Sequence, residues 1–282
     1  MVAVNFFFLY KSQNILGLAD MYFCNHIYVK DSLSRQMTSR QQEPGAEMGF
    51  LDHLGELRRR LLYSAYGILA GCIISGYYGR EIIEVLFLQP ARDAGIDLQN
   101  IEPFGQTLLF FKVVLIAGVI IASPWIFYQV WRFVEPGLYR TERSWALKIA
   151  LATTFFFLAG VFFGYRYLIP QMLKYVSDFT IGDIKNNIYI GNHISFMINM
   201  LLAGGFIFEL PVVAGVLARF GIVTATTMRR FRRHSIVVIL ILAAMITPSP
   251  DPMSQLMLAV PLWVLYEFSV IVAKVLEPKT VE

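Results

Sequence analysis

The sequence has little charge and few cysteines or histidines, and each shortage excludes a class of protein. Only 16% of its 282 residues are charged, against 56% that are apolar, whereas about a quarter of an ordinary soluble domain is charged. Its two cysteines and four histidines lack the spacing of metal ligands or of a disulfide framework. The sequence also lacks a phosphate-binding glycine motif and a nucleophile–base pair. We therefore expect no soluble domain, no catalytic activity, no cofactor and no nucleic-acid partner.

Long apolar runs take the place of charge and predict an all-α integral membrane protein. A helix needs about 20 apolar residues to cross a bilayer, and the mean hydropathy of the chain is +0.56. Six runs approach or reach that length, at about 61–79, 105–132, 145–167, 193–220, 235–247 and 255–273. The fifth is short and the sixth is interrupted by Pro261. We therefore expect six transmembrane helices, of which the last two are short and thin the bilayer locally.

The connections between these runs differ in charge, and the difference predicts an orientation. One side collects the cations Arg58–Arg60, Arg132, Arg140, Arg143, Arg229, Arg230, Arg232, Arg233, Lys274 and Lys279. The other side holds the acidic segment 80–102 and a nearly neutral segment at 171–192, where we expect Pro170 to end the third span and a short interfacial helix to follow at 171–179. Basic connections stay in the cytoplasm, so both termini are expected to be cytoplasmic.

The two ends of the chain differ from the apolar middle. Residues 1–47 contain one apolar patch, VAVNFFFLY, which is too short to cross a membrane and lacks the features of a secretory signal. We expect this extension to be disordered, weakly interfacial or the product of a mis-assigned start. The membrane domain is expected to cover residues 48–275, and residues 276–282 are expected to form a cytoplasmic tail.

An aromatic and basic segment, PWIFYQVWRFVEPGLYRTER at 124–143, ends the second run. Trp125, Tyr128 and Trp131 are three residues apart, so on a helix they share one face, and such rings favour the membrane surface. Pro136 and Gly137 then interrupt the helix. This segment is either a loop anchored at the membrane surface or a binding surface for a charged peptide, and its periodicity does not decide between them.

Several acidic residues stand where an ordinary membrane helix would not place them. Glu209 lies about ten residues from Arg219 and thus deep in the bilayer, where an acid costs about 2.5–3.5 kcal/mol. It is either a neutral group bonded to another helix or a functional polar site, for example of a proton-coupled secondary transporter. Glu56 and Glu142 are surrounded by arginines; they form weak local ion pairs or accept a cationic ligand in a bidentate fork. Glu267 is either a second polar group of the same kind as Glu209 or the partner of the cation at position 274 near the membrane surface.

Five blocks of the sequence resemble the TatC subunit of the twin-arginine protein translocase. They are HLGELRRR (53–60), EPF (102–104), SPWIFYQVWRFVEPGLYRTER (123–143), FELPVV (208–213) and TPSPDPMSQ with AVPLWVLYE (247–267). The resemblance covers roughly residues 48–275 in the family's order. It implies a cup-shaped bundle of six helices in the bacterial cytoplasmic (inner) membrane. It also implies a receptor for Arg-Arg signal peptides of folded precursor proteins, which are exported using the proton gradient.

The same resemblance implies partners and roles for individual residues. The implied partners are single-span TatA- and TatB-type subunits, other TatC copies and membrane lipid. The residues implied to bind the signal peptide are Glu56, Arg58, Phe133 and Glu142. Those implied to contact partner subunits, as polar groups within the membrane, are Glu209, Thr247 and Gln255. Pro103 and Phe104 are implied to shape a cap on the periplasmic side. A transporter centred on Glu209 stays open as the alternative, since it would form a transport path from this chain alone.

Overall fold

The structure, a computed structural model, describes residues 50–135, 145–178, 187–247 and 252–277. By its internal contacts the chain divides into two units, Met1–Gly55 and Glu56–Glu282. The described part of the first unit is the beginning of helix α2 (Phe50–Tyr77). The second unit holds the rest of α2 and every other described helix and strand. Helix α2 is continuous from Phe50, and Phe50, Leu54 and Leu57 recur at helical spacing along its start.

After α2 the chain bends by 80° into a second helical arm. This arm consists of α3 (Gly79–Ile82), the π-helix η1 (Ile83–Leu88) and α4 (Gln89–Asp93). Gly79, at the start of this arm, permits close packing on the neighbouring helix, because a Cβ at this position would lie 2.7 Å from the Phe110 ring. The acidic segment expected as an open connection is therefore helical as far as Asp93.

Among the described residues, four helices are long and apolar enough to cross a membrane, or five if the bent pair counts as one span. The first is α5 (Gly105–Val134). The second joins α6 (Trp145–Phe163), the π-helix η3 (Gly164–Leu168) and α7 (Ile169–Asp178). The third joins α8 (Ile190–Ile207) and α9 (Leu210–Arg219), and the fourth is α12 (Pro252–Leu276). Between them lie α10 (Ala225–Arg230) and α11 (Arg232–Ile246).

Two expectations about helix length are wrong. Pro170 does not end the third run, because the helix continues through it to Asp178. The π-helix directly before Pro170 widens the turn, so the missing proline N–H and the ring are accommodated. The expected separate interfacial helix is the last part of this same helix. Likewise α12 has 25 residues with Pro261 inside it, so the sixth helix is not short, whereas α11 has 15 residues and is short as expected.

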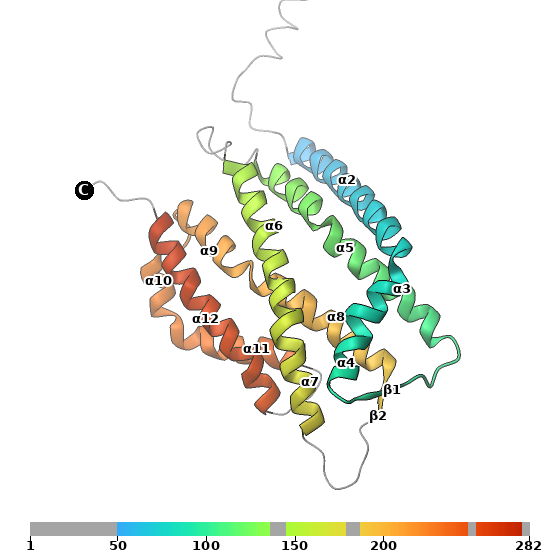
Figure 1. The fold of residues 1–282 in the computed structure, drawn as a ribbon. Coiled ribbons are helices and arrows are strands. Elements are labelled where there is room, and N and C mark those ends of the chain that lie inside the picture. The colour runs from blue at the N-terminus through green and yellow to red at the C-terminus, as the bar shows by residue number, and fades with distance from the viewer. Residues whose placement is uncertain (1–49, 136–144, 179–186, 248–251, 278–282) are drawn as a thin grey trace, which may run out of the picture. The chain divides into compact units, whose positions relative to one another are not determined.

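Small residues bring the backbones of neighbouring helices together. A Cβ on Gly160 of α6 would overlap the carbonyl oxygen of Gly204 on α8, and a Cβ on Gly204 would lie 2.6 Å from the carbonyl oxygen of Gly160. Such contacts between glycines are a usual way to pack helices in membranes, where lipid removes the hydrophobic drive for association. The α6–α8 pair forms the centre of the unit in Figure 1.

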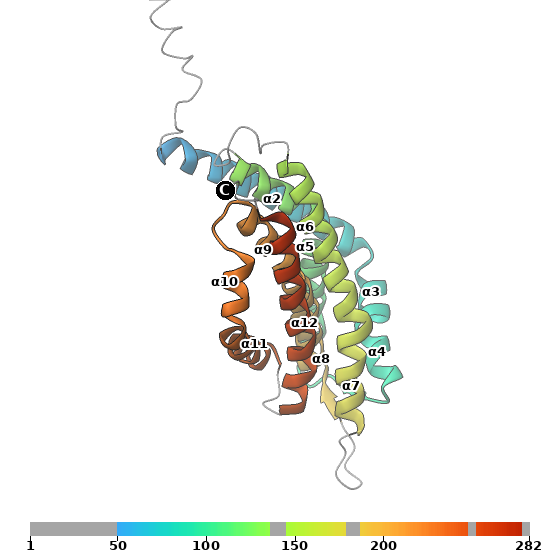
Figure 2. The same ribbon diagram turned by 90° about the vertical axis from the view of Figure 1, so that its left-hand side faces the viewer.

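A two-stranded parallel sheet joins two connections that no pattern in the sequence indicates as partners. Strand β1 (Asp97–Gln99) pairs with β2 (Asn187–Tyr189), with Leu98 opposite Ile188. At the other end of the same unit, the end of α5, the start of α6 and the ends of α9 and α12 lie together (Figures 1 and 2). We call this end, which holds Val134, Trp145, Arg219 and Leu276, the upper end.

Candidate functional site

Close packing of α2 against α5 positions the candidate site at the upper end. The Ser75 hydroxyl donates to the carbonyl oxygen of Val114 at 2.6 Å, and the Trp125 indole N–H donates to the carbonyl oxygen of Tyr63 at 2.9 Å. Midway between these bonds, a Cβ on Gly71 would overlap the backbone of α5. Because the two backbones approach so closely, the polar side chains near the start of α2 meet the last turns of α5.

Glu56, Arg60 and Gln129 form a hydrogen-bonded chain between these two helices. The Arg60 guanidinium donates through two nitrogens to Glu56 Oε1, at 3.1 and 3.4 Å, and through the third to Gln129 Oε1 at 3.2 Å. The side chains of Arg60 and Glu56 are only 17% and 13% exposed, and Gln129 is buried. Arg59 is a second, more exposed cation, at 4.0 Å from the same carboxylate oxygen. A carboxylate is thus held in one orientation at the edge of the helix pair.

The other residues implied to bind a peptide lie around this chain or outside the described residues. Arg58 is exposed, two residues along α2 from the carboxylate. Phe133 is half-buried on α5, one turn beyond Gln129 and therefore on the same helix face. The carboxylate predicted at position 142 lies outside the described residues, so its distance from Glu56 is not defined.

Two further contacts fix the end of α5. The Trp131 indole N–H donates to Thr153 Oγ1 of α6 at 2.9 Å. Arg132 pairs with Glu135 at 2.7 Å, one turn later. The aromatic segment predicted as a surface anchor therefore also joins α5 to α6, and it holds the face that carries Gln129 in one place.

Glu209 lies at the break between α8 and α9. Its backbone N–H bonds the carbonyl of Phe206 instead of continuing the α-helical pattern, and Pro211 follows in the first turn of α9. The side chain is buried, and among the described residues its Oε1 has no hydrogen-bond partner. The helix break thus places an incompletely satisfied carboxyl within a candidate span.

The two other polar residues assigned to partner contacts bond within the chain. The Thr247 hydroxyl donates to the carbonyl of Ala243 at 2.9 Å at the end of α11. The Gln255 amide donates to the carbonyl of Leu240 at 2.7 Å, which ties α12 to α11. Gln255 is half-buried and Thr247 is buried. In this structure both residues stabilise the short helix α11.

The cap residues and Glu267 complete the predicted set. Pro103 and Phe104 are exposed directly before α5, and Phe104 is 79% exposed. Glu267 does not pair with Lys274, as one of its two interpretations expected, but with Arg232 of α11 at 2.6 Å. The expectation failed because it considered neighbours along one helix, whereas α11 packs against this part of α12.

Sequence reasoning missed Gln129 and the bridging role of Arg60. The signal for Gln129 was present, because it is the one amide in an otherwise aromatic and apolar segment ending α5. An amide at such a position is expected to find a partner on another helix. The partner could not be chosen from sequence, since three consecutive arginines at 58–60 offer similar charge and only the packing selects the third.

Comparison with known proteins places these residues in a family. A family model described as "Sec-independent protein translocase protein (TatC)" matches residues 52–261. The TatC protein of Deinococcus radiodurans is 37% identical over 235 residues, which cover 82% of this chain and 87% of that protein. The TatC protein of Aquifex aeolicus is 33% identical over 239 residues, with 83% and 98% covered. A crystal structure of "Twin Arginine Translocase Receptor- TatC" superposes with a TM-score of 0.70 at 33% identity and covers 79% of this chain and 99% of that one.

Proposed function

The chain belongs to the TatC family of Sec-independent protein translocase proteins, and we propose that it is the subunit that receives twin-arginine signal peptides. As a family member it is a multi-pass membrane component of the Tat translocase in the bacterial cytoplasmic (inner) membrane. Its proposed ligand is the Arg-Arg pair of the signal peptide of a folded precursor protein. Peptide binding is followed by export that draws on the proton gradient.

The observation that carries this proposal is the carboxylate of Glu56 between two helices. Glu56 accepts two hydrogen bonds from one guanidinium of its own chain, so its geometry already suits an arginine. A planar guanidinium matches a carboxylate with two parallel hydrogen bonds, which a lysine ammonium does not. This difference supports a preference for Arg-Arg over Lys-Lys. In the proposal Glu142 receives the second arginine, and Arg58 and Phe133 line the same surface.

We place this surface in the cytoplasm. The upper end carries Arg132, Lys148, Arg219 and Lys274 near the ends of long apolar helices, and basic connections remain on the cytoplasmic side. With α11 counted as a short crossing and the bent α2–α4 pair as another, six crossings put both termini in the cytoplasm, and the helices enclose a cup. Residues 48–275 form this domain, with an extension before it and a short tail after it.

Partner subunits are proposed to contact the polar groups that lie along the candidate spans. Single-span TatA- and TatB-type helices, and further copies of this chain, meet it at Glu209 and near the α11–α12 pair. An incompletely satisfied carboxyl supports this assignment for Glu209, because a partner helix can supply the missing donor. Thr247 and Gln255 act by holding α11 in position, and Pro103 with Phe104 shapes the periplasmic cap.

Peptide binding by the purified full-length chain tests the proposal. A twin-arginine signal peptide and its Lys-Lys variant are titrated against wild-type protein, Glu56→Gln and Glu142→Gln in detergent. Glu84→Gln is the matched control, because Glu84 also pairs with an arginine, Arg92 at 2.6 Å, but lies on the far arm beyond the 80° bend. We expect a clear Arg-Arg preference that Glu56→Gln and Glu142→Gln abolish and the control retains.

Equal binding of both peptides, or an equal loss in Glu84→Gln and Glu56→Gln, would contradict this site. The other interpretation of the sequence, a proton-coupled transporter centred on Glu209, is not favoured, since the family model and the solved structure that match are those of a protein translocase. It would require Glu209→Gln to abolish a transport activity of this chain in vesicles without partner subunits.

A further inference from the structure

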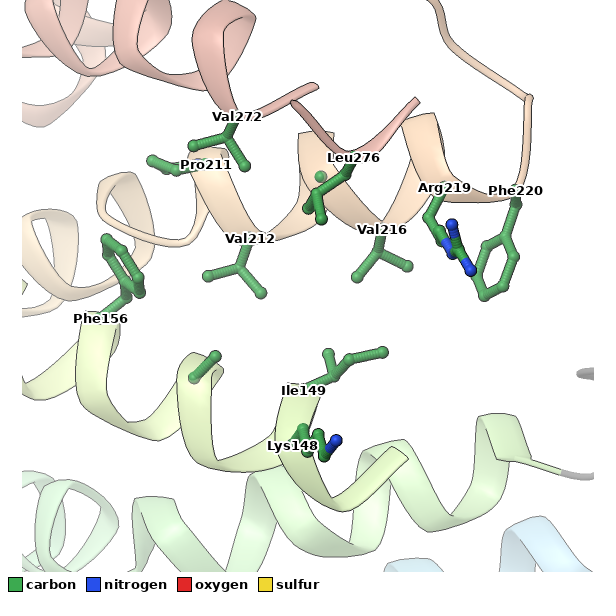
Figure 3. A pocket seen from close by; sticks show the side chains of 12 residues that line it. Lys148, Ile149, Phe156, Pro211, Val212, Val216, Arg219, Phe220, Val272 and Leu276 are labelled. Carbon is green, nitrogen blue, oxygen red and sulfur yellow. The ribbon is translucent and has the colours of Figure 1, made fainter. Parts of the chain in front are cut away.

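An apolar groove opens at the upper end between α6, α9 and α12, away from the α2–α5 pair. It has a volume of about 240 Å³ and is lined by twelve residues. Ten of them are alanine, glycine, proline or larger apolar side chains, including Phe156, Val216 and Leu276. Figure 3 shows α6 on one side of the groove and α9 with α12 on the other. Nothing in the proposed peptide site uses this groove.

The two remaining lining residues are cations on opposite walls. Lys148 is in the first turn of α6, and Arg219 is the last residue of α9. Figure 3 shows Arg219 beside Phe220 at one end of the groove and Lys148 on the α6 wall below Ile149, whereas Phe156 and Pro211 lie at the opposite end. The groove therefore has a positively charged mouth and an apolar interior, along a direction that runs from the upper end toward the middle of the helices.

We propose that this groove binds one anionic membrane phospholipid, with an acyl chain in the apolar part and the phosphate between Lys148 and Arg219. Guanidinium and ammonium groups at the membrane surface attract anionic headgroups. A hydrocarbon chain requires no hydrogen-bond partner, and the groove provides apolar contact along its length. The ligand class is thus defined by both ends of the site, since neither a free phosphate nor a neutral lipid would use the whole of it.

The chemistry of the groove disfavours a peptide as its occupant. An extended peptide would bring backbone N–H and C=O groups into an apolar wall that offers them no partners. An acyl chain has no such groups, so it can lie against this wall without loss of hydrogen bonds.

Lipid binding by the full-length protein, stripped of lipid in detergent, tests this inference. Phosphatidylglycerol and phosphatidylcholine with identical acyl chains are titrated and counted by native mass spectrometry. The variants are Lys148→Gln with Arg219→Gln, and Ala152→Phe, which fills the groove without a change of charge. The matched control is Arg166→Gln with Lys174→Gln, two exposed cations that line a separate hollow on η3 and α7.

We expect the Lys148/Arg219 double variant to bind phosphatidylglycerol about 30-fold more weakly, from the typical contribution of each cation near a membrane surface. Its phosphatidylcholine binding should not change, and the Arg166/Lys174 control should bind both lipids as wild type does. Ala152→Phe should weaken both lipids. A further test uses wild-type protein alone. Glycerol phosphate should not displace phosphatidylglycerol from it, because glycerol phosphate lacks the acyl chain.

Three results would overturn the inference. They are wild-type affinity of the Lys148/Arg219 variant for phosphatidylglycerol, an equal loss in the Arg166/Lys174 control, and displacement by glycerol phosphate. The thermal unfolding temperature of each variant shows whether a loss of lipid binding is caused by misfolding. If it is, the lipid titrations and the glycerol phosphate displacement on wild-type protein test the inference. Signal-peptide affinity is measured in parallel and should be unchanged in the double variant, so failure of the lipid site and failure of the peptide site are distinguishable.

Discussion

Substitution of Gly204 by alanine tests the close contact between α6 and α8. A Cβ at this position lies 2.6 Å from the carbonyl oxygen of Gly160 and 3.4 Å from the Cα of Gly164. Since ordinary contact begins near 3.4 Å, α6 and α8 must separate by most of an ångström to accommodate the methyl group. Overpacking of this kind costs about 1–3 kcal/mol, and the better helix propensity of alanine returns about 0.5–1 kcal/mol. We expect a net loss of about 1–2 kcal/mol in the free energy of unfolding.

Gly76→Ala is the matched control, because the nearest atom to its Cβ is Val114 Cγ1 at an ordinary 3.7 Å. The same change in a helix with room should stabilise the protein by about 0.5–1 kcal/mol. Thermal and denaturant unfolding in detergent, followed by circular dichroism at the helix band, measures both. The two variants should shift stability in opposite directions. A Gly204→Ala variant as stable as Gly76→Ala would refute the close approach of α6 and α8.

Three further predictions each remove the hydrogen bonds of one side chain. Arg60→Met should lower the free energy of unfolding by about 1–3 kcal/mol, because a carboxylate and a buried amide lose their donor. Arg92→Met, which removes an exposed ion pair, should lower it by less than about 1 kcal/mol. Denaturant titration of both variants measures the difference. Gln255→Leu should speed amide hydrogen exchange throughout α11 while the exchange of α8 stays unchanged. Trp131→Phe should cost about 1 kcal/mol through its lost bond to α6, and Trp263→Phe, 45% exposed, should leave the unfolding temperature unaltered.

The long spans could be predicted from sequence because their signal is local. Twenty consecutive apolar residues determine that a helix is present, and α5 begins at the predicted Gly105 and ends within two residues of the predicted Arg132. The effect of the prolines on helix length was harder to predict. Pro170 and Pro261 both lie inside long helices, since a wider π-turn before the first, and neighbouring helices around the second, can satisfy the backbone. The rule that proline ends a helix applies to proteins in water, where solvent can bond the backbone groups of a broken turn.

The contacts between glycines and the pairing of the two strands could not be predicted from hydropathy. Gly160 and Gly204 are 44 positions apart by their numbers, and no pattern within either run indicates which glycine meets which. The pairing of β1 with β2 depends likewise on where two connections meet after the helices have packed. Such contacts between distant segments follow from the tertiary arrangement, and a single sequence records them only as isolated small or polar residues.

The carboxylate of Glu56 shows why the site was only half predictable. The sequence offered two accounts, a local ion pair or a receptor for a cation, as if one excluded the other. The structure has the ion pair, with Arg60 one turn away. A carboxylate with 13% exposure would be costly without a cation, so the arginine of its own chain serves as its partner before any ligand arrives.

Under the proposed function, binding of a signal peptide is then an exchange of one guanidinium for another. One nitrogen of Arg60 retains Gln129 as its acceptor when Glu56 turns to the ligand, so the guanidinium stays partly bonded within the chain during the exchange. Because one cation replaces another in the exchange, the total electrostatic attraction contributes little to the net affinity. The shape of the donor group then determines which peptide binds better. An ammonium offers one point of contact where a guanidinium offers a fork. The pre-existing pair therefore favours selectivity for arginine over lysine at the expense of tight binding, which suits a receptor that must release its cargo.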